Sequence, residues 1–311
     1  MSNFITSYQK IKQSISNGSY YISNIKTSLE RPPILVIELT SKCNLHCTMC
    51  GKDNSTRVKE HMNFELFKQI VNDAKESNIN AFQLSYYGES TLYPKLIEAI
   101  NYLKEKIPNS FISLNTNGLT LTPQFIKNLL DTNINSIVIS IEGNNKEEYE
   151  AIRVGASWNL LRKNIKKLRE MIDVGNYPTK IGIMGLNVDK IYIDQELYVK
   201  TWGEYSNTIF TRNTKELNAK IKEPTFHKLL PCRKLFGEMV IMTSGEVTRC
   251  DYDWEGKVSY GNVKDSNILE LWNNPTLRQI RQKHLLGQKR KIDFCDSCTY
   301  RVDPFKKSNL L

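Results

Sequence analysis

The sequence predicts an α/β protein, in which a parallel sheet with crossover helices is followed by a smaller α+β domain rich in cysteine. Strand-like runs alternate with helix-like segments from residue 34 to residue 212, an order that favours a parallel sheet. The alternation then stops, and a hairpin pattern and four cysteines follow. A chain of 311 residues is long enough for one large core and a second, smaller domain.

Four segments follow from this division. Residues 1–32 are expected to form a short helical extension, which is too short for a separate peptide-recognition domain. Residues 33–212 carry the alternating strands and helices. Residues 213–230 are polar and indicate a linker. Residues 231–311 form the second domain.

Six strand-like runs are expected in the first domain. The chemistry of parallel α/β sheets gathers at the carboxyl ends of their strands, so the residues that follow these runs are the candidates for a site. The runs are Ile34–Leu39, Ala81–Tyr86, Phe111–Asn115, Ser136–Ile141, Lys180–Leu186 and Thr208–Arg212.

Helix-like segments lie between these runs. Asn63 can cap the first helix, and Thr122 followed by Pro123 is typical of a third helix start. The others are expected over 94–103, 158–172 and 189–202. In the second domain we expect a hairpin of Phe236–Met242 and Val247–Cys250 that turns at Gly245, and one helix over Leu269–Leu286.

Composition excludes some classes of protein. The chain is 40% hydrophobic and 24% charged, which is ordinary for a globular protein. No apolar run approaches the roughly 18 residues of a transmembrane helix, and the first residues lack the pattern of a signal peptide, so we expect a cytoplasmic protein. The net charge of +10 is scattered over amphipathic segments without a recognised nucleic-acid module. An anionic small substrate is compatible with that charge.

Three cysteines follow the first expected strand at the spacing C-x3-C-x2-C, namely Cys43, Cys47 and Cys50. Three thiolates can hold three irons of a cubane [4Fe–4S] cluster, whose full ligation takes four. The fourth iron is then open to a substrate or cofactor. A fragment of a zinc site is the alternative.

This spacing resembles the signature of the radical S-adenosylmethionine (radical SAM) enzymes. The resemblance implies a partial (β/α)6, TIM-like barrel, a cluster whose open iron is chelated by SAM, and a 5′-deoxyadenosyl radical that abstracts hydrogen from the substrate. It also implies an external electron donor such as flavodoxin or ferredoxin. Met49 stands where the family usually has an aromatic residue, and it joins the expected cofactor-binding residues.

Two turns after later strands resemble SAM-binding motifs of the family. Gly88 and Glu89 match the middle of the Gly-Gly-Glu-Pro-like motif that binds the SAM amino group, and Glu89 can pair with an ammonium. Asn117 lies in a Thr-Asn-Gly turn that is similar to one near SAM. Each sequence alone is also an ordinary turn.

The fourth and fifth strands supply the remaining candidates. By resemblance, Ser140 and Arg153 hold the SAM carboxylate, which suits the planar fork of Arg. Glu142 is expected to contact ribose or substrate, and its alternative is a solvated acid at a helix N-terminus. Leu186 ends a run that resembles the adenine-contacting stretch, although an interior strand would look the same.

Four further cysteines form a second set. Seven cysteines that cluster as three plus four favour metal binding over disulfides. The second set can saturate an auxiliary [4Fe–4S] cluster or build a zinc site, and its surroundings resemble the SPASM/twitch extension with one auxiliary cluster. The four histidines show no shared metal spacing. The second set is Cys232, Cys250, Cys295 and Cys298.

The resemblance to the SPASM/twitch enzymes implies oxidation of a secondary alcohol in a sugar, a cyclitol or an anionic derivative. All seven cysteines are assigned, so no thiol is left to return hydrogen to a substrate radical, while a saturated cluster can accept an electron. Alternatives are a redox-neutral sugar epimerase, with Tyr86 or Tyr87 as the hydrogen donor, and a peptide (RiPP) maturase. A non-catalytic zinc or iron–sulfur protein is a further alternative.

Overall fold

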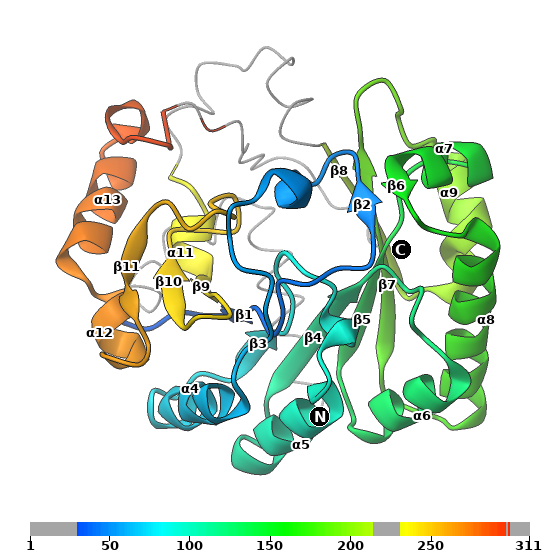
Figure 1. Cartoon of the computed structure of the whole chain (residues 1–311), viewed down its shortest axis with the longest axis horizontal. Helices are drawn as coiled ribbons and strands as arrows, with labels where there is room; N and C mark the ends of the chain where they lie inside the picture. The colour runs from blue at the N-terminus through cyan, green and yellow to red at the C-terminus, as the bar shows by residue number, and fades with distance from the viewer. Residues whose placement is uncertain (1–29, 214–230, 297, 299–311) are drawn as a thin grey trace.

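The computed structural model describes residues 30–213, 231–296 and 298 (Figure 1). The expected N-terminal extension and the expected linker therefore lie almost wholly outside the described residues. None of the described helices is both long and apolar enough to cross a membrane.

Six strands form the parallel sheet that the sequence predicts. Each pairs in parallel with the next along the chain. The second strand is shorter than expected and ends at Gln83, so the chain from residue 84 is free to form the loop that carries Tyr86 to Glu89. The strands are β1 (Leu35–Ile37), β3 (Ala81–Gln83), β4 (Phe111–Thr116), β5 (Ser136–Ser140), β7 (Lys180–Asn187) and β8 (Thr208–Asn213).

Helices cover the outer side of this curved sheet (Figure 1). The Asn63 side chain accepts hydrogen bonds at the first turn of α4, and Thr122 does the same for α6, whose first residue is Pro123. These caps satisfy backbone N–H groups that have no partner within the helix. The helices are α4 (Phe64–Glu76), α5 (Leu96–Lys106), α6 (Pro123–Asp131), α7 (Lys146–Ile152), α8 (Trp158–Val174) and α9 (Gln195–Trp202).

The strands of the second domain continue the same sheet. β9 (Met239–Ile241) pairs in parallel with β1, β10 (Glu246–Thr248) pairs antiparallel with β9, and β11 (Ser259–Asn262) pairs with β10. The result is one nine-stranded sheet in the order β11-β10-β9-β1-β3-β4-β5-β7-β8. Gly245 lies in the hairpin turn with φ +89°, a conformation that favours glycine.

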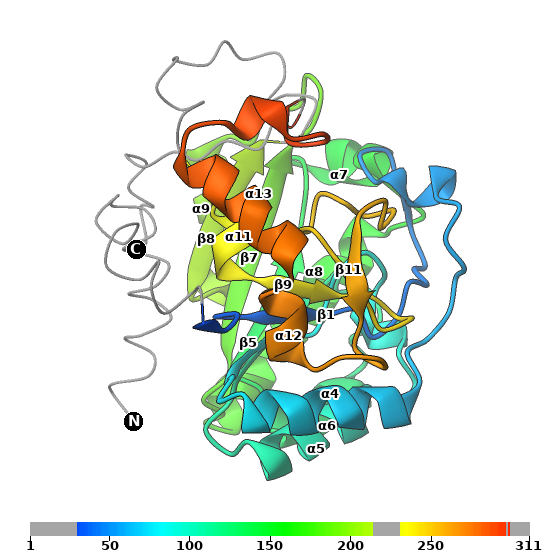
Figure 2. The ribbon, with the colours of Figure 1, turned by 90° about the vertical axis from the view of Figure 1, so that its left-hand side faces the viewer.

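The prediction of a single helix over Leu269–Leu286 is wrong. The structure has two helices there, α12 (Ile268–Trp272) and α13 (Pro275–Leu285), which Figure 2 shows as separate segments. Pro275 lacks an N–H and cannot continue a helix, but it suits the first position of a new one. Asn274 caps that new helix.

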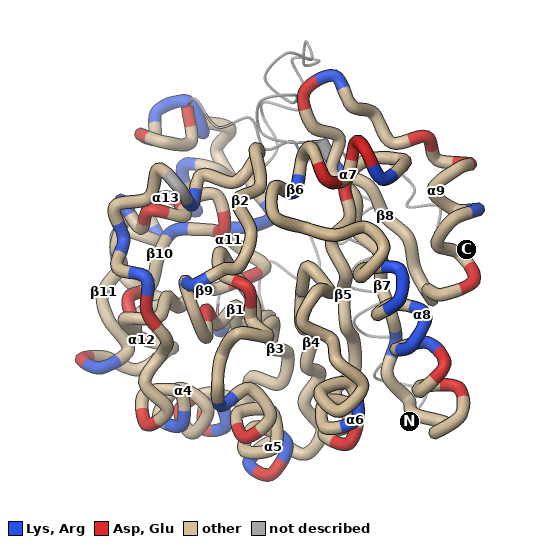
Figure 3. The backbone as a smooth tube through the Cα atoms, turned by 45° about the vertical axis from the view of Figure 1, so that its right-hand side comes forward, with Lys and Arg blue, Asp and Glu red and all other residues tan. Residues whose placement is uncertain are grey.

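Charged side chains lie along the outer helices. Figure 3 shows that Lys and Arg positions alternate with Asp and Glu positions along the backbone of these helices. Several of the pairs are exposed and three or four residues apart, such as Lys127 with Asp131 and Lys167 with Glu170. Pairs of this kind add little to stability.

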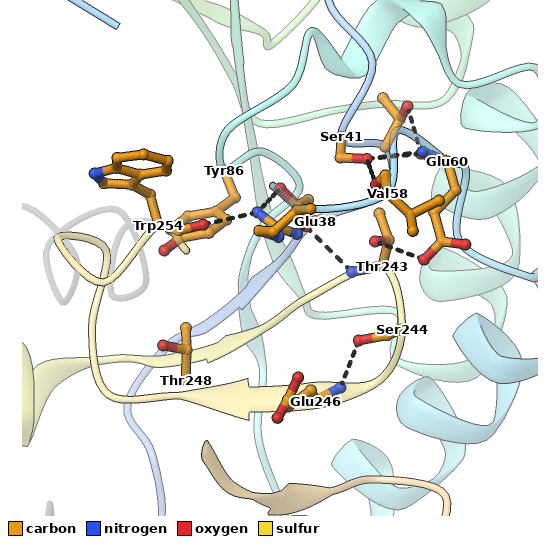
Figure 4. A network of polar contacts seen from close by, with 12 residues as sticks. Glu38, Ser41, Val58, Glu60, Tyr86, Thr243, Ser244, Glu246, Thr248 and Trp254 are labelled. Atoms are coloured by element: carbon orange, nitrogen blue, oxygen red, sulfur yellow. Dashed lines mark hydrogen bonds and ion pairs between the residues drawn. The ribbon is translucent and has the colours of Figure 1, made fainter. Parts of the chain in front are cut away.

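One buried ion pair joins the two domains. Glu38 directly follows β1 and is fully buried, and its carboxylate binds the guanidinium of Arg57. The same carboxylate accepts from the backbone N of Thr243 at 3.2 Å, and Arg57 donates to the Trp254 carbonyl at 3.0 Å. Figure 4 shows Glu38 between these two parts of the second domain. Burial raises the pKa of Glu38, and Arg57 opposes that shift.

We predict that Glu38→Gln lowers the free energy of unfolding by about 3 kcal/mol, because it leaves Arg57 without its counter-charge in a mostly buried site. Chemical denaturation of the full chain measures the loss. The matched control is Glu170→Gln, which breaks an exposed pair and should cost less than about 1 kcal/mol. Equal losses in the two variants would show that the buried pair has no special role.

Candidate functional site

The first three cysteines lie in a loop at the carboxyl end of β1. Within it, β2 (His46–Cys47) pairs with β6 (Arg153–Val154), so that Cys47 lies opposite Arg153. Burial raises the pKa of the Cys47 thiol to about 11, Arg153 opposes this, and the neighbouring Cys50 and Cys43 add to the rise. The three half-buried thiols therefore interact, next to a guanidinium from β6.

A buried lysine fixes the shape of this loop. The Lys52 ammonium donates to the Leu45 carbonyl at 2.5 Å and to the Cys43 carbonyl at 3.3 Å. Burial raises the pKa of the Cys43 thiol, and the charge of Lys52 is among the groups that lower it. Sequence reasoning missed Lys52. Its signal was slight, a single basic residue two positions after the last cysteine of the loop.

Gly88 and Glu89 bring the second loop against the first. A Cβ at Gly88 would lie 2.1 Å from the Thr40 carbonyl oxygen, so only glycine allows this approach. The backbone N of Glu89 donates to the Lys42 carbonyl at 2.8 Å. Gly88 therefore allows the loop after β3 to pack against the start of the cysteine loop.

The Glu89 carboxylate joins the loops that follow β3 and β4. It is buried and accepts from the backbone N and hydroxyl of Thr91, from the hydroxyl of Thr116 and from the backbone N of Asn117. Three of these donors reach Oε1 and one reaches Oε2. A carboxylate has about four acceptor sites, so the described donors leave room for one more on Oε2. Its pairing with the SAM ammonium stays a prediction, and the structure gives Glu89 a bridging role that the sequence did not indicate.

Asn117 links the third loop to the cysteine loop. Its side-chain nitrogen donates to Asn44 Oδ1 at 2.9 Å, and its oxygen accepts from the backbone N of Leu119. The loops after β1, β3 and β4 therefore form one hydrogen-bonded set at the edge of the sheet where the cysteines lie.

Arg153 and Glu142 form a buried pair beside Cys47. Glu142 is fully buried and binds Arg153 Nε, so the alternative of a solvated acid is wrong. Glu142 Oε1 and the Tyr149 hydroxyl are buried without a hydrogen-bond partner among the described residues. Among the described residues, Nε is the only nitrogen of the Arg153 side chain that donates to an acceptor. The two terminal nitrogens are therefore available to donate to a ligand.

The other candidates lie at the same end of the sheet. Ser140 is the last residue of β5, Leu186 is next to the last residue of β7, and Met49 lies between the second and third cysteines; all three are half-buried. Their contacts with SAM stay predictions.

All four cysteines of the second set line one cavity, although 17, 44 and 2 residues separate them in sequence. Burial raises the pKa of the Cys232 thiol to about 12. Lys234, Arg249 and Lys289 line the same cavity. A cubane cluster held by four thiolates is an anion, and these cations suit it. Within the described ranges, no three His, Cys, Asp or Glu side chains are arranged to hold a single metal ion. The four cysteines instead surround a cavity, an arrangement that suits a cluster better than one zinc ion.

Two buried donors at this cavity lack acceptors. His284 is 1% exposed and lines the cavity, and its Nε2 atom has no partner in the part of the chain that the structure describes. The same holds for Nε of Arg249, whose Nη1 reaches Cys295 Sγ at 3.8 Å. A sulfur-rich anion among the four thiols would supply acceptors, so the residues present fit an iron–sulfur cluster. Burial, with the charges of Lys289 and Arg249, lowers the pKa of His284 to about 4. Sequence reasoning set this histidine aside because its spacing showed nothing.

Aromatic side chains connect the two cysteine sites. Tyr87 stacks on Trp254 of the second domain, with ring centroids 5.2 Å apart. A Cβ on Gly51, next to Cys50, would lie 2.6 Å from the Trp254 ring. The Tyr86 hydroxyl donates to the Cys250 carbonyl at 3.4 Å. The two tyrosines therefore contact both sites from one loop.

Comparison with known families agrees with this geometry. The signature of the radical SAM superfamily matches residues 37–191, and that of the SPASM iron–sulfur cluster-binding domain matches residues 232–299. The tungsten-containing aldehyde ferredoxin oxidoreductase cofactor-modifying protein of Pyrococcus furiosus is 26% identical over 86% of this chain and 88% of its own length. A probable GTP 3′,8-cyclase of Methanococcus maripaludis is 31% identical, over only 49% of each chain.

Solved structures share the fold. BtrN, crystallised with AdoMet and 2-DOIA, superimposes with a TM-score of 0.61 and 18% identity over 89% of this chain and 96% of its own. Streptococcus suis SuiB, bound to the precursor peptide SuiA, gives a TM-score of 0.65 and 16% identity over 92% of this chain and 74% of its own.

We predict that Arg153→Ala weakens SAM binding to the cluster-loaded protein by about tenfold to a hundredfold, since a charged hydrogen-bonding partner is lost. Arg153→Lys keeps the charge but not the fork, and should recover only part of the affinity. Equilibrium dialysis with labelled SAM measures both, and Arg162→Ala, on an exposed position of α8, is the control. Unchanged affinity in Arg153→Ala would contradict the assignment.

Proposed function

We propose that this chain, which belongs to the radical SAM superfamily and carries a SPASM iron–sulfur domain, oxidises a secondary alcohol of a sugar or cyclitol to a ketone. The observation that carries the proposal is the cavity that all four cysteines of the second set line. With three cysteines in the first loop, the seven of the sequence are then used. No thiol is left to return a hydrogen atom, and the second site is suited to take up an electron.

The bound cofactors would supply the radical that removes hydrogen from the carbinol carbon and the acceptor for the electron released with the hydroxyl proton. The chain's own residues would position the reactants. Arg153, held by Glu142, would present its terminal nitrogens to the SAM carboxylate. Tyr87 and Trp254 stack on each other beside Gly51 of the first cysteine loop, and the substrate would lie near this contact between the two domains.

The similarity to BtrN supports a small substrate. The layout of a barrel and one auxiliary site is similar to that of the twitch-type 2-deoxy-scyllo-inosamine dehydrogenases, and BtrN was crystallised with 2-DOIA and aligns over 96% of its own chain. The net charge of +10 would attract an acidic electron donor such as flavodoxin or ferredoxin, and an anionic sugar derivative as substrate.

Two rival functions have a specific observation in their favour. SuiB, which binds a precursor peptide, superimposes with the higher TM-score, and this favours peptide maturation. Tyr86 and Tyr87 lie between the cysteine sites, and a tyrosine that returned hydrogen would make the enzyme a sugar epimerase.

The test is turnover of the cluster-loaded, full chain with SAM, a chemical reductant and a panel of cyclitols and amino-cyclitols that includes 2-deoxy-scyllo-inosamine. We expect a ketone and 5′-deoxyadenosine in equal amounts, measured by mass spectrometry. Cys295→Ala should keep SAM cleavage and lose more than about 90% of ketone formation, because the electron acceptor is lost. Cys43→Ala, the control, should lose both.

The product also separates the rivals. Turnover in heavy water that places deuterium on the carbinol carbon without forming a ketone indicates epimerisation. Modification of a peptide in place of a cyclitol indicates a maturase. Normal ketone formation by Cys295→Ala would remove the electron-accepting role of the second site.

A further inference from the structure

One histidine enters the cavity of the second cysteine set. His284 lies in the last turn of α13 and is 1% exposed. The backbone N of Cys232 donates to its Nδ1 atom at 3.2 Å. Its Nε2 atom is buried, and none of the described residues accepts a hydrogen bond from it.

The contact with Cys232 fixes where the ring hydrogen lies. A nitrogen that accepts a hydrogen bond carries a lone pair, so Nδ1 of His284 has no hydrogen. The hydrogen of the ring is therefore on Nε2, which is a donor. A buried donor without an acceptor costs about 1–3 kcal/mol, and native proteins rarely keep one. We therefore expect the acceptor for Nε2 to lie in the cavity that the His284 ring lines.

The cationic side chains that line the cavity are donors and cannot accept a hydrogen bond. Arg249 donates to the Asp293 carbonyl at 2.5 Å and to Cys295 Sγ. Lys234 binds Glu238 and Asp251. What the cavity itself offers is thiol sulfur, and with a cluster present it offers inorganic sulfide and thiolate, which accept hydrogen bonds.

We propose that His284 donates a hydrogen bond from Nε2 to a sulfur of the auxiliary cluster and thereby raises the reduction potential of that cluster. The reduced cluster carries one more negative charge than the oxidised one, so a donor stabilises the reduced state more. The contact with Cys232 orients the ring and couples this donor to a cysteine ligand. The inference rests on the auxiliary cluster and not on which substrate the enzyme takes.

Two variants separate the donor from the rest of the side chain. In His284→Asn, the amide oxygen can still accept from Cys232 N, but no donor reaches the position of Nε2. In His284→Gln, the longer side chain places an amide nitrogen near that position. The test is an EPR-monitored redox titration of the full chain with both clusters loaded. SAM is expected to change the signal of the first cluster, so the signal that SAM leaves unchanged gives the potential of the auxiliary cluster.

We expect a lower potential for His284→Asn, a potential near that of the natural protein for His284→Gln, and the same iron content in both. His61→Asn is the matched control and should change nothing. His61 also has a buried nitrogen without a partner among the described residues, but it lies in another pocket, with Met62 and Tyr93. An unchanged potential in His284→Asn, or equal falls in the two His284 variants, overturns the proposal.

A measurement on the unmodified sequence does not depend on how the variants fold. Pulsed EPR of protein labelled with ¹⁵N-histidine should show weak nitrogen coupling to the auxiliary cluster and, after exchange into heavy water, a nearby deuteron. A strongly coupled nitrogen would mean that His284 is an iron ligand, and no coupling would mean that it makes no contact. Either result overturns the proposal, and neither bears on the oxidation of an alcohol.

Discussion

The placement of the two cysteine sites depends on the carboxylate of Glu38. It stands where β1 ends and the first cysteine loop begins, and it binds Arg57 from beyond that loop and the backbone of Thr243 from the second domain. β9 pairs with β1 residue for residue, so the turn that follows β9 lies beside the start of the first cysteine loop. Removal of either partner would leave an uncompensated charge in a buried site, which is strongly destabilising. The pairing of β1 with β9 and the Glu38–Arg57 ion pair thus fix the position of the second domain relative to the first cysteine loop.

Short-range patterns explain what the sequence could predict. The strand runs, and the caps at Asn63 and Thr122, depend on neighbours a few residues away, and the structure confirms them. Pro275 carried a signal of the same range, but the apolar residues on both sides of it made two helices resemble one. The cysteine sets were visible for the same reason, because thiols are rare and their spacing within each loop is short.

The features that sequence reasoning missed depend on contacts between distant residues. Glu38 meets Thr243 across 205 positions, and His284 meets Cys232 across 52. In the sequence Lys52 resembles an ordinary surface lysine, and only the folded loop shows that its ammonium binds the Leu45 carbonyl. Neither periodicity nor local spacing encodes such pairs, since they form only once the sheet order is set. Glu89 shows a subtler limit: its position was predicted correctly, while its four hydrogen bonds were not.

Both cysteine sites follow one electrostatic plan. Burial raises the pKa of Cys47 to about 11 and of Cys232 to about 12, so thiols alone would stay protonated at neutral pH. Iron requires thiolates, and cluster insertion must therefore expel protons. The negative charge that results is met by Arg153 and Lys52 at one site, and by Arg249 at the other. Part of the positive charge of this chain thus lies inside the protein, where it compensates buried anions.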